Sequence, residues 1–144
     1  MKIKDIMTKN IISITVEASL KELAILIKQH RINGVPVVNK EGALVGIITM
    51  TDILKILKDI YYWSELESVK PGLGVKDALM AEKEKATIET KMTTNVRTVK
   101  EDDTVEDVLK LMCRYNIHTI PVVKDGKLVG VVGVTDIVYA VFNV

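Results

Sequence analysis

Two Thr-Asp pairs end two nearly identical segments of the chain. One segment is "GIITMTDIL" at residues 46–54, and the other is "GVVGVTDIV" at residues 130–138. In each, an apolar run typical of a strand leads directly into helical spacing, so the pair falls at a strand-to-helix junction. Backbone N–H groups at a helix start attract anions. Hydroxyl and carboxylate oxygens beside them could therefore bind a phosphorylated sugar.

We expect the carboxylates of Asp52 and Asp136 to bind a ribose. A carboxylate at a helix start repels a phosphate, but it can accept hydrogen bonds from both the 2′- and the 3′-hydroxyl of a ribose. The hydroxyls of Thr49, Thr51 and Thr135 would then lie near the sugar or the phosphate. Helix capping is the simpler interpretation, since Thr is a good N-cap and Asp suits the first helical turn. Taken alone, the pairs leave both interpretations open.

The two segments belong to an internal duplication. The run "IMTKNIISI" at 6–14 matches "KMTTNVRTV" at 91–99, and "RINGVPVV" at 31–38 matches "NIHTIPVV" at 116–123, both with an offset of 85 residues. The offset is 84 at the Thr-Asp pairs, because "NKEG" in the first copy is one residue longer than "KDG" in the second. Such a difference fits a hairpin turn. A repeat kept in register over the chain indicates two copies of one structural unit.

Each copy predicts the element order β-α-β-β-α, which is an α/β fold. Capping boxes begin the first helix of each copy, as "SLKE" at 19–22 and "TVED" at 104–107. The predicted apolar helix faces are Leu20, Leu23, Ala24 and Ile27 in the first copy, and Val105, Val108, Leu109 and Met112 in the second. The predicted strands are 11–14, 35–38 and 44–49, then 96–99, 120–123 and 128–132. The second helices are expected over about 52–60 and from 136 to the C-terminus.

Composition bounds the function classes. Of 144 residues, 48% are hydrophobic and 4% aromatic, so the core must consist mainly of aliphatic side chains. The net charge of +1 argues against nucleic-acid binding, which usually requires a basic excess. A single cysteine, Cys113, excludes an internal disulfide and a cysteine-based zinc site. No signal peptide or membrane-length apolar run is visible, so we expect a cytoplasmic protein without membrane contact.

The organisation expected from the repeat is one integrated module. Residues 1–60 form the first copy, residues 88–144 form the second, and residues 61–87 form a linker with a helix expected over 75–86. Tyr61, Tyr62 and Trp63 begin the linker. They are expected to cap the core or to lie at a dimer contact, with contact to a ligand base as the alternative.

The two copies resemble a tandem pair of cystathionine-β-synthase (CBS) domains, known as a Bateman module. The motifs are "DIMT" with "KMTT", "HRINGVPVV" with "YNIHTIPVV", and the pattern GxxTxTD formed by Gly46, Thr49, Thr51 and Asp52. The resemblance covers residues 3–54 and 88–138. It implies two repeats packed through their small sheets about a pseudo-twofold axis, clefts between the repeats, and a disc-like homodimer that regulates an unidentified protein.

The resemblance also implies ligands and site residues. The expected ligand contains adenosine, as AMP, ADP, ATP, S-adenosylmethionine or methylthioadenosine, and its ribose lies on Asp52 or Asp136. Residues 97–101 are expected near Asp52, and residues 12–16 near Asp136. The segments "GVPVV" and "TIPVV" would form the base wall with their backbone groups, through Gly34, Val35, Pro36, Thr119, Ile120 and Pro121. The residues expected on the phosphate side are Asn33, Arg97 and His118.

Departures from the family pattern predict two unequal clefts. Gly133 stands where the family usually has Ser or Thr, so the second copy lacks one hydroxyl. We therefore expect the complete site at Thr49 and Asp52, and a larger loss of binding from Asp52→Ala than from Asp136→Ala. Asn33 and Thr119 replace basic residues of some nucleotide-sensing members. A monophosphate or S-adenosylmethionine is thus favoured over a triphosphate.

The sequence does not predict an enzyme. His30 and His118 fall at different positions of the repeat, and neither has metal-ligand spacing or a nucleophile partner. We therefore predict no catalytic residue, no metal site and no catalytic cofactor. The leading interpretation is a regulatory module that senses an adenosine ligand. The alternative is a protein-interaction scaffold whose clefts have degenerated.

Overall fold

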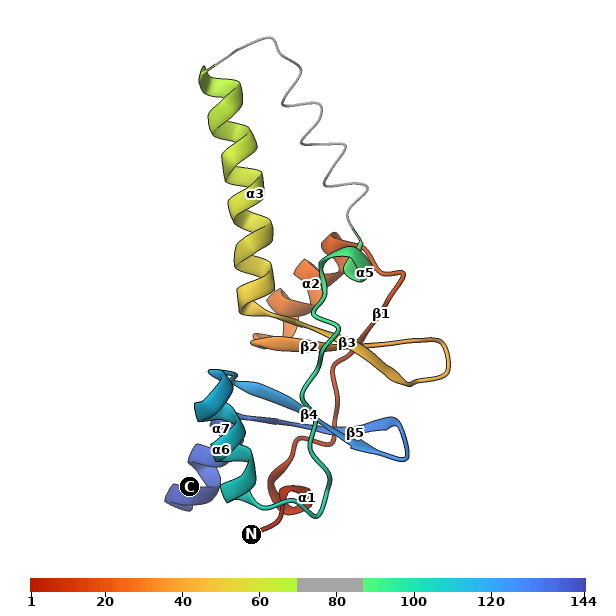
Figure 1. The fold of residues 1–144 in the computed structure, drawn as a ribbon, viewed down its shortest axis with the longest axis vertical. Helices are drawn as coiled ribbons and strands as arrows, with labels where there is room; N and C mark the ends of the chain where they lie inside the picture. The colour runs from red at the N-terminus through yellow and green to blue at the C-terminus, as the bar shows by residue number, and fades with distance from the viewer. Residues whose placement is uncertain (70–86) are drawn as a thin grey trace.

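The computed structural model describes residues 1–69 and 87–144, and of residues 60, 61 and 63–69 it describes only the backbone. Two similar halves lie one above the other, each with a β-hairpin and flanking helices (Figure 1). The hairpins face each other across the middle of the molecule. The α/β class and the packing of two repeats through their sheets are as the sequence predicts.

The first repeat contains a three-stranded sheet of order β1-β2-β3. Strand β1 (Ile14–Thr15) is parallel to β2 (Gly34–Val38), which is antiparallel to β3 (Leu44–Thr49). Helix α2 (Leu20–His30) precedes the hairpin, and α3 (Met50–Val69) follows it. The first strand is shorter than the predicted 11–14 and begins later, because the preceding residues cross over from the other repeat.

The second repeat contains a two-stranded antiparallel sheet of β4 (Thr119–Lys124) and β5 (Lys127–Gly133). Helices α6 (Val105–Tyr115) and α7 (Val134–Phe142) flank it. The strand predicted over 96–99 is reduced to one parallel bridge between Val99 and Val122. The hairpin turns at Asp125 and Gly126, which have positive φ angles of 52° and 77°. An Asp-Gly turn of this kind matches the twist of an antiparallel pair.

Each copy begins with a short helix that packs against the core of the other copy. Helix α1 (Ile3–Ile6) begins the chain, but Ile3 and Met7 lie in the core of the second repeat, with Val108 and Val132. Helix α5 (Ile88–Lys91) begins the second copy, but Ile88 lies in the core of the first repeat. The two intervening segments, residues 8–13 and 93–98, run between the halves. Each apolar core is therefore built from both copies.

The capping boxes are confirmed, while part of the predicted helix faces is wrong. The Ser19 hydroxyl accepts from the Glu22 N–H at 3.1 Å, and Thr104 accepts in the same way from Asp107 at 3.2 Å. Ala24 and its repeat equivalent Leu109, which were expected inside, are exposed. The buried stripe is narrower than predicted, because each helix packs on its small sheet along one row. In α6 that row is Val105, Val108 and Met112.

Helix α3 is longer than the predicted 52–60. It runs to Val69, since no Gly or Pro interrupts the sequence before Pro71. The aromatic run at 61–63 therefore lies inside a helix. Tyr62 is 64% exposed and stands about 18 Å along the helix axis from Met50. The side chains of Tyr61 and Trp63, and the helix expected over 75–86, lie outside the described residues.

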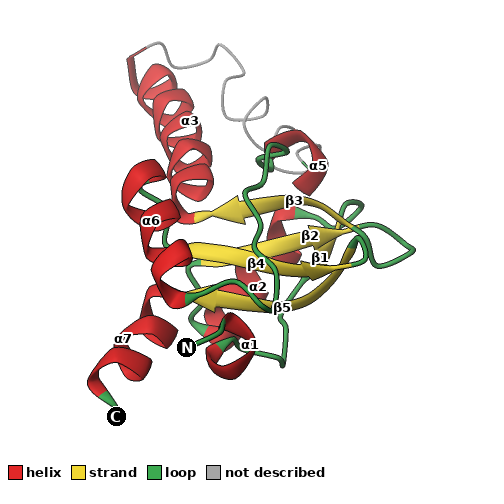
Figure 2. Cartoon of the chain, turned by 60° about the horizontal axis from the view of Figure 1, so that its bottom comes forward, coloured by secondary structure: helices red, strands yellow, loops and turns green. Residues whose placement is uncertain are grey.

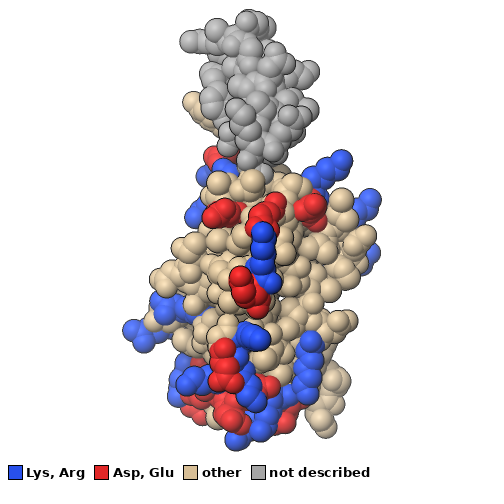
Figure 3. Space-filling model, turned by 90° about the vertical axis from the view of Figure 1, so that its right-hand side faces the viewer, with Lys and Arg blue, Asp and Glu red and all other residues tan. Residues whose placement is uncertain are grey.

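Charged side chains of both signs are interspersed on the face shown in Figure 3. This distribution agrees with the net charge of +1 and gives that face no basic stripe. Among the described residues, no helix combines the length and apolar character that crossing a membrane requires.

Candidate functional site

Both Thr-Asp pairs lie where a strand passes into a helix, and both junctions lie at the same end of the molecule, opposite the hairpin turns (Figure 2). The start of each helix is tied to the segment before its hairpin. The N–H of Met50 donates to the carbonyl of Asn33, and the N–H of Val134 donates to the carbonyl of His118, both at 3.1 Å. Residues from three parts of each repeat are thereby held together.

In the first junction, the Asp52 carboxylate accepts hydrogen bonds from two residues of the protein, Thr49 and Thr93. Its Oδ2 accepts from the Thr49 N–H at 2.9 Å and from the Thr49 hydroxyl at 3.1 Å. The Thr93 hydroxyl donates to the same carboxylate at 3.0 Å. Asp52 is only 8% exposed, the one buried charged or polar side chain among the described residues. The Thr49 hydroxyl therefore holds the carboxylate inside the protein.

In the second junction, the Asp136 carboxylate has fewer partners and more exposure. Its Oδ2 accepts from the Gly133 N–H at 2.7 Å, and its Oδ1 accepts from the Thr8 hydroxyl at 3.2 Å. Gly133 has no hydroxyl to add, so the contact that Thr49 makes in the first junction has no counterpart. Asp136 is half-buried. Oxygen lone pairs of this carboxylate are available to a ligand.

Residues 8–13 and 93–98, which run between the two halves, are called the crossing segments. The first residue of each crossing segment forms hydrogen bonds at one junction. The backbones of Thr8 and Val131 exchange two hydrogen bonds, and those of Thr93 and Ile47 exchange two more. Thr8 and Thr93 are equivalent residues of the repeat, and both donate to the junction carboxylate. Residues 97–101 were expected near Asp52 and residues 12–16 near Asp136. The hydrogen bonds to the two carboxylates come from the earlier residues Thr93 and Thr8, while Ile12 lines the cleft that contains Asp136.

The glycine of each GxxTxTD-type segment makes room for a methionine. A Cβ on Gly46 would lie 2.5 Å from the Met92 sulfur, and one on Gly130 would lie 2.5 Å from the Met7 sulfur. Met7 and Met92 precede the two crossing threonines directly. The shared "MT" of the two copies therefore packs one residue against the junction glycine and bonds the next to the junction carboxylate.

A cleft of about 600 Å³ lies between the two junctions. This volume is within the range typical of small-molecule sites. Both repeats contribute equivalent pairs to its lining, and the segment from Thr8 to Ile12 adds residues on the side of Asp136. The predicted site residues that line it are Asn33, Gly34, Pro36, Thr49, Thr51, His118, Thr119, Thr135 and Asp136.

Other predicted site residues do not line this cleft. Val35, Ile120 and Pro121 are buried in the hairpins, where side chains alternate between the two faces of a sheet. Asp52 lies behind Thr49. The additional hydroxyl of the first copy, that of Thr49, donates to the Asp52 carboxylate.

Arg97, predicted on the phosphate side, is directed to an aromatic ring. Its guanidinium carbon lies 3.2 Å from the centroid of the Tyr115 ring at the end of α6. This is a cation–π contact. Ile12, the repeat equivalent of Arg97, lines the cleft on the Asp136 side. The two crossing segments are thus unlike at the same position.

Several lining residues were missed by sequence reasoning. They are the crossing residues Thr8 and Asn10, the helix-start residues Met50 and Val134, and the helix-end residues Arg31 and Asn116. Thr8 and Asn10 could have been found, because the repeat keeps both of their types in register with Thr93 and Asn95. Arg31 and Asn116 differ in type, so the repeat gave no reason to pair them.

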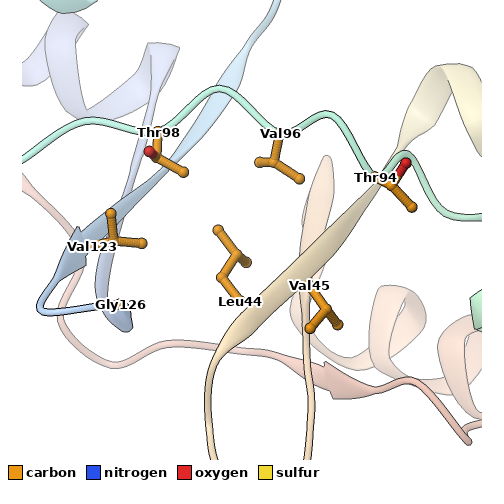
Figure 4. A pocket seen from close by; sticks show the side chains of 7 residues that line it. All are labelled: Leu44, Val45, Thr94, Val96, Thr98, Val123 and Gly126. Carbon is orange, nitrogen blue, oxygen red and sulfur yellow. The ribbon is translucent and has the colours of Figure 1, made fainter.

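A second, smaller cavity of about 250 Å³ lies near the hairpin turns. Thr94, Val96 and Thr98 of the crossing segment lie over Leu44 and Val45 of β3 and Val123 of β4 (Figure 4). None of the described residues that line this cavity is charged. It has neither a carboxylate nor a cation for a nucleotide, so the larger cleft is the candidate site.

Comparisons with known proteins agree with this arrangement. The family model described as the CBS domain matches residues 3–59 and again residues 86–143. The uncharacterized protein MJ1426 of Methanocaldococcus jannaschii is 36% identical, over 97% of this chain and 90% of its own length. An L-aspartate semialdehyde sulfurtransferase of the same organism is 37% identical over 94% of this chain, which spans 22% of that enzyme.

Solved structures show the same fold. The CBS domain pair of protein MJ0100, solved in complex with 5′-methylthioadenosine and S-adenosyl-L-methionine, has a TM-score of 0.76 and 35% identity, over 98% of this chain and 99% of its own. CBSX2, solved in complex with AMP, also has a TM-score of 0.76, at 22% identity over 99% of this chain and 96% of its own.

Proposed function

The chain belongs to the CBS domain family, as a tandem pair, and from this premise we propose that it is a regulatory module that binds an adenosine-containing ligand between its two repeats. The observation that carries the proposal is the cleft itself. It brings both strand-to-helix junctions together, and its lining includes a half-buried carboxylate, Asp136, together with Thr49, Thr51 and Thr135.

The proposed ligand pose follows from these groups. The Asp136 carboxylate accepts hydrogen bonds from the ribose hydroxyls, which a carboxylate can do in pairs. The backbone of Gly34 and Thr119, at the starts of β2 and β4, lies in the same cleft and can contact the edge of the base. The apolar residues Ile32, Pro36 and Ile117 supply its walls. The MJ0100 pair, at 35% identity, supports an adenosine-type ligand.

We assign the principal ribose-binding role to Asp136, not to Asp52. The Asp52 carboxylate is 8% exposed and accepts from Thr49 and Thr93, so a ribose would have to displace protein hydrogen bonds. Asp136 requires displacement of the Thr8 hydroxyl at most, at 3.2 Å. This assignment replaces the expectation drawn from the motif alone.

The module acts by population shift in this proposal. A ligand that contacts both repeats favours one relative arrangement of the halves, and the size of the effect equals its difference in affinity for the two arrangements. Met50 and Val134 line the cleft and begin α3 and α7. A ligand that contacts Met50 and Val134 would therefore affect the positions of α3 and α7.

A second copy of the chain is the proposed partner at those helices. Equivalent apolar side chains are exposed at the same i, i+4, i+7 spacing on both: Met50, Leu54 and Leu57 on α3, and Val134, Val138 and Val141 on α7. Two matching stripes suit a twofold dimer, which would cover both. Leu54→Glu and Val138→Glu should yield monomers in sedimentation velocity. A wild-type monomer would contradict the dimer.

The regulated protein is proposed to be a further partner in the cytoplasm, where adenine nucleotides and S-adenosylmethionine occur. In this proposal the chain regulates and does not catalyse. In the described part of the chain, no three or more His, Cys, Asp or Glu side chains are grouped so that they could hold a metal ion.

Ligand-induced stabilisation tests the function. Melting temperatures should be measured with AMP, ADP, ATP, S-adenosylmethionine and methylthioadenosine separately. A ligand at 100 times its Kd adds about 2.7 kcal/mol to the free energy of unfolding, which is visible as a shift in melting temperature. If no compound shifts it, the binding function is wrong, and the exposed helix stripes would then favour an interaction scaffold.

A carboxamide variant tests the site. Asp136→Asn keeps the shape of the side chain and its acceptor for the Gly133 N–H, but removes the charge. It should weaken ligand binding about tenfold or more, since hydrogen bonds to charged acceptors are the stronger class. Asp125→Asn, in the exposed hairpin turn, is the matched control and should bind normally. Equal binding by Asp136→Asn would exclude the proposed pose.

A further inference from the structure

Arg31 is in an uncommon backbone conformation at the edge of the cleft. It caps the C-terminus of α2 with φ 51° and ψ 45°, in the left-handed region. Its repeat equivalent Asn116 caps α6 with φ 51° and ψ 48°. Asn tolerates this region, whereas a long side chain there carries a cost in conformational free energy. The first repeat thus has an unfavourable residue where the second has a suitable one.

The Arg31 guanidinium is also without an anionic partner among the side chains that the structure describes. The ion pairs of the described residues involve other side chains, such as Lys2 and Lys4 with Asp102. Arg31 is exposed and lines the cleft, as does Asn116. An unpaired cation in a strained position, facing a ligand site, is explained by neither packing nor capping.

The first repeat contributes a positive charge to the cleft, and the second contributes a negative charge. Among the described residues that line it, Arg31 and Asp136 are the only Lys, Arg, Asp or Glu side chains, and they come from different repeats. Asp136 is bonded to Gly133 and Thr8 of its own side, so it does not neutralise Arg31. Asn33, Asn116 and His118 add neutral or weakly basic hydrogen-bonding groups. The cleft therefore offers a carboxylate for hydroxyls and one guanidinium for an anion.

We propose that Arg31 binds the anionic tail of the ligand, so that the cleft selects nucleosides with a negatively charged 5′ group over those with a neutral one. This inference rests on the proposed function and specifies its ligand class. A guanidinium can bind a phosphate through two parallel N–H donors, which gives both affinity and orientation. A single guanidinium facing a carboxylate suits a monophosphate better than a triphosphate, because further phosphates would lack a cation.

The substitution Arg31→Asn is well suited to test this inference. Asn already occupies the equivalent backbone conformation in the second repeat, so the variant should fold, with a melting temperature equal to or above that of the wild type. Lys28→Gln is the matched control, because Lys28 is an exposed cation in the last turn of the same helix and does not line the cleft.

Isothermal titration calorimetry with AMP, adenosine and methylthioadenosine gives the readout. Wild-type protein and Lys28→Gln should bind AMP at least about tenfold more tightly than either neutral nucleoside, since charge-assisted hydrogen bonds are of this strength. Arg31→Asn should lose that preference and keep its affinity for adenosine within about twofold. Added salt should reduce the preference of the wild type, because exposed charges are screened.

Two results would overturn the inference in different ways. If wild-type protein binds AMP and adenosine equally, or if Arg31→Asn weakens the binding of AMP and adenosine equally, Arg31 does not bind the anionic 5′ group. The proposed binding of nucleosides would then still hold. If none of the three compounds binds to wild-type protein, this inference and the proposed function both fail.

Discussion

The two strand-to-helix junctions have the same backbone and different exposure of the same carboxylate. At the first, Thr49 and Thr93 hold Asp52 inside the protein. At the second, Gly133 leaves Asp136 half-buried beside the cleft. One hydroxyl accounts for the local difference. A residue that matches a binding motif more fully can therefore contribute more to the stability of the protein and less to its site.

The largest expected contrast is in stability. Asp52→Ala removes the acceptor for the Thr49 N–H in a part-buried position, and we expect it to lower the free energy of unfolding by about 2–3 kcal/mol. Asp136→Ala should cost about 1 kcal/mol, as the loss of a capping side chain at a helix start does. Urea denaturation measures both. Equal losses would show that the junctions do not differ in the way described.

The junction glycines Gly46 and Gly130 provide a reference for this difference in stability, because the same substitution can be made at both. Gly46→Ala and Gly130→Ala each place a Cβ against Met92 or Met7 and within 3.2 Å of a crossing-segment carbonyl. We expect each to lower the free energy of unfolding by about 1–2 kcal/mol, because the packed methionine must move. Chemical denaturation should give similar values for the two variants. A large difference would mean that the repeats also differ in this packing.

Replacing Gly133 by Thr, the residue at the equivalent position 49, should make Asp136 resemble Asp52 in its hydrogen bonds and exposure. Gly133 has φ −114°, and its nearest neighbours to an added Cβ lie at 3.6 Å or more, so a side chain fits. Gly133→Thr should add about 0.5–1 kcal/mol of stability as a helix cap and weaken ligand binding severalfold, since its hydroxyl would engage Asp136. Thermal melts and calorimetry check the two effects. Stronger ligand binding would instead support a direct contact of this hydroxyl with ligand.

The smallest expected effect concerns the attachment of α1. Hydrogen bonds and charge from Lys4 and Lys2 hold the pKa of Asp102 below its ordinary value of about 3.9. A lowered folded-state pKa gives stability that is present above the ordinary value and lost as the pH falls through the folded-state value. Asp102→Asn should therefore reduce the acid sensitivity of the melting temperature below about pH 4, and salt should do the same.

The first repeat offers a control for that pH dependence. Glu17 is equivalent to Asp102 and faces only Lys40, at 4.0 Å between exposed groups. Glu17→Gln should leave the acid sensitivity unchanged, because exposed single pairs contribute little. If both variants behaved alike, the Lys2–Lys4–Asp102 cluster would have no particular role.

Sequence reasoning succeeded where the signal was local or repeated. The duplication predicted the hairpins, and the capping boxes at Ser19 and Thr104 predicted two helix starts. Both signals depend on residues a few positions apart. The GxxTxTD pattern of the first copy and its GxxGxTD counterpart in the second likewise predicted the two junctions, because strand and helix periodicities meet at the Thr-Asp pair.

It failed where the outcome depends on residues distant in sequence. The Asp52 carboxylate accepts from the Thr93 hydroxyl, which comes from the other copy. The direction of Arg97 depends on the Tyr115 ring, and the place of Arg31 in the cleft depends on the opposed repeat. The motif therefore predicted the two junctions, but it did not determine which of their carboxylates lines the cleft.

The exchange of α1 and α5 has a consequence for how the chain folds during synthesis. The first core lacks Ile88 until the ribosome has passed the middle of the chain, and the second core needs Ile3, which is made before any of its other members. Contacts so far apart in sequence slow folding. The N-terminal residues cannot pack until the second repeat has been synthesised, so neither half can fold as an independent domain. Removing the first residues would destabilise the second repeat, whose core contains Ile3 and Met7.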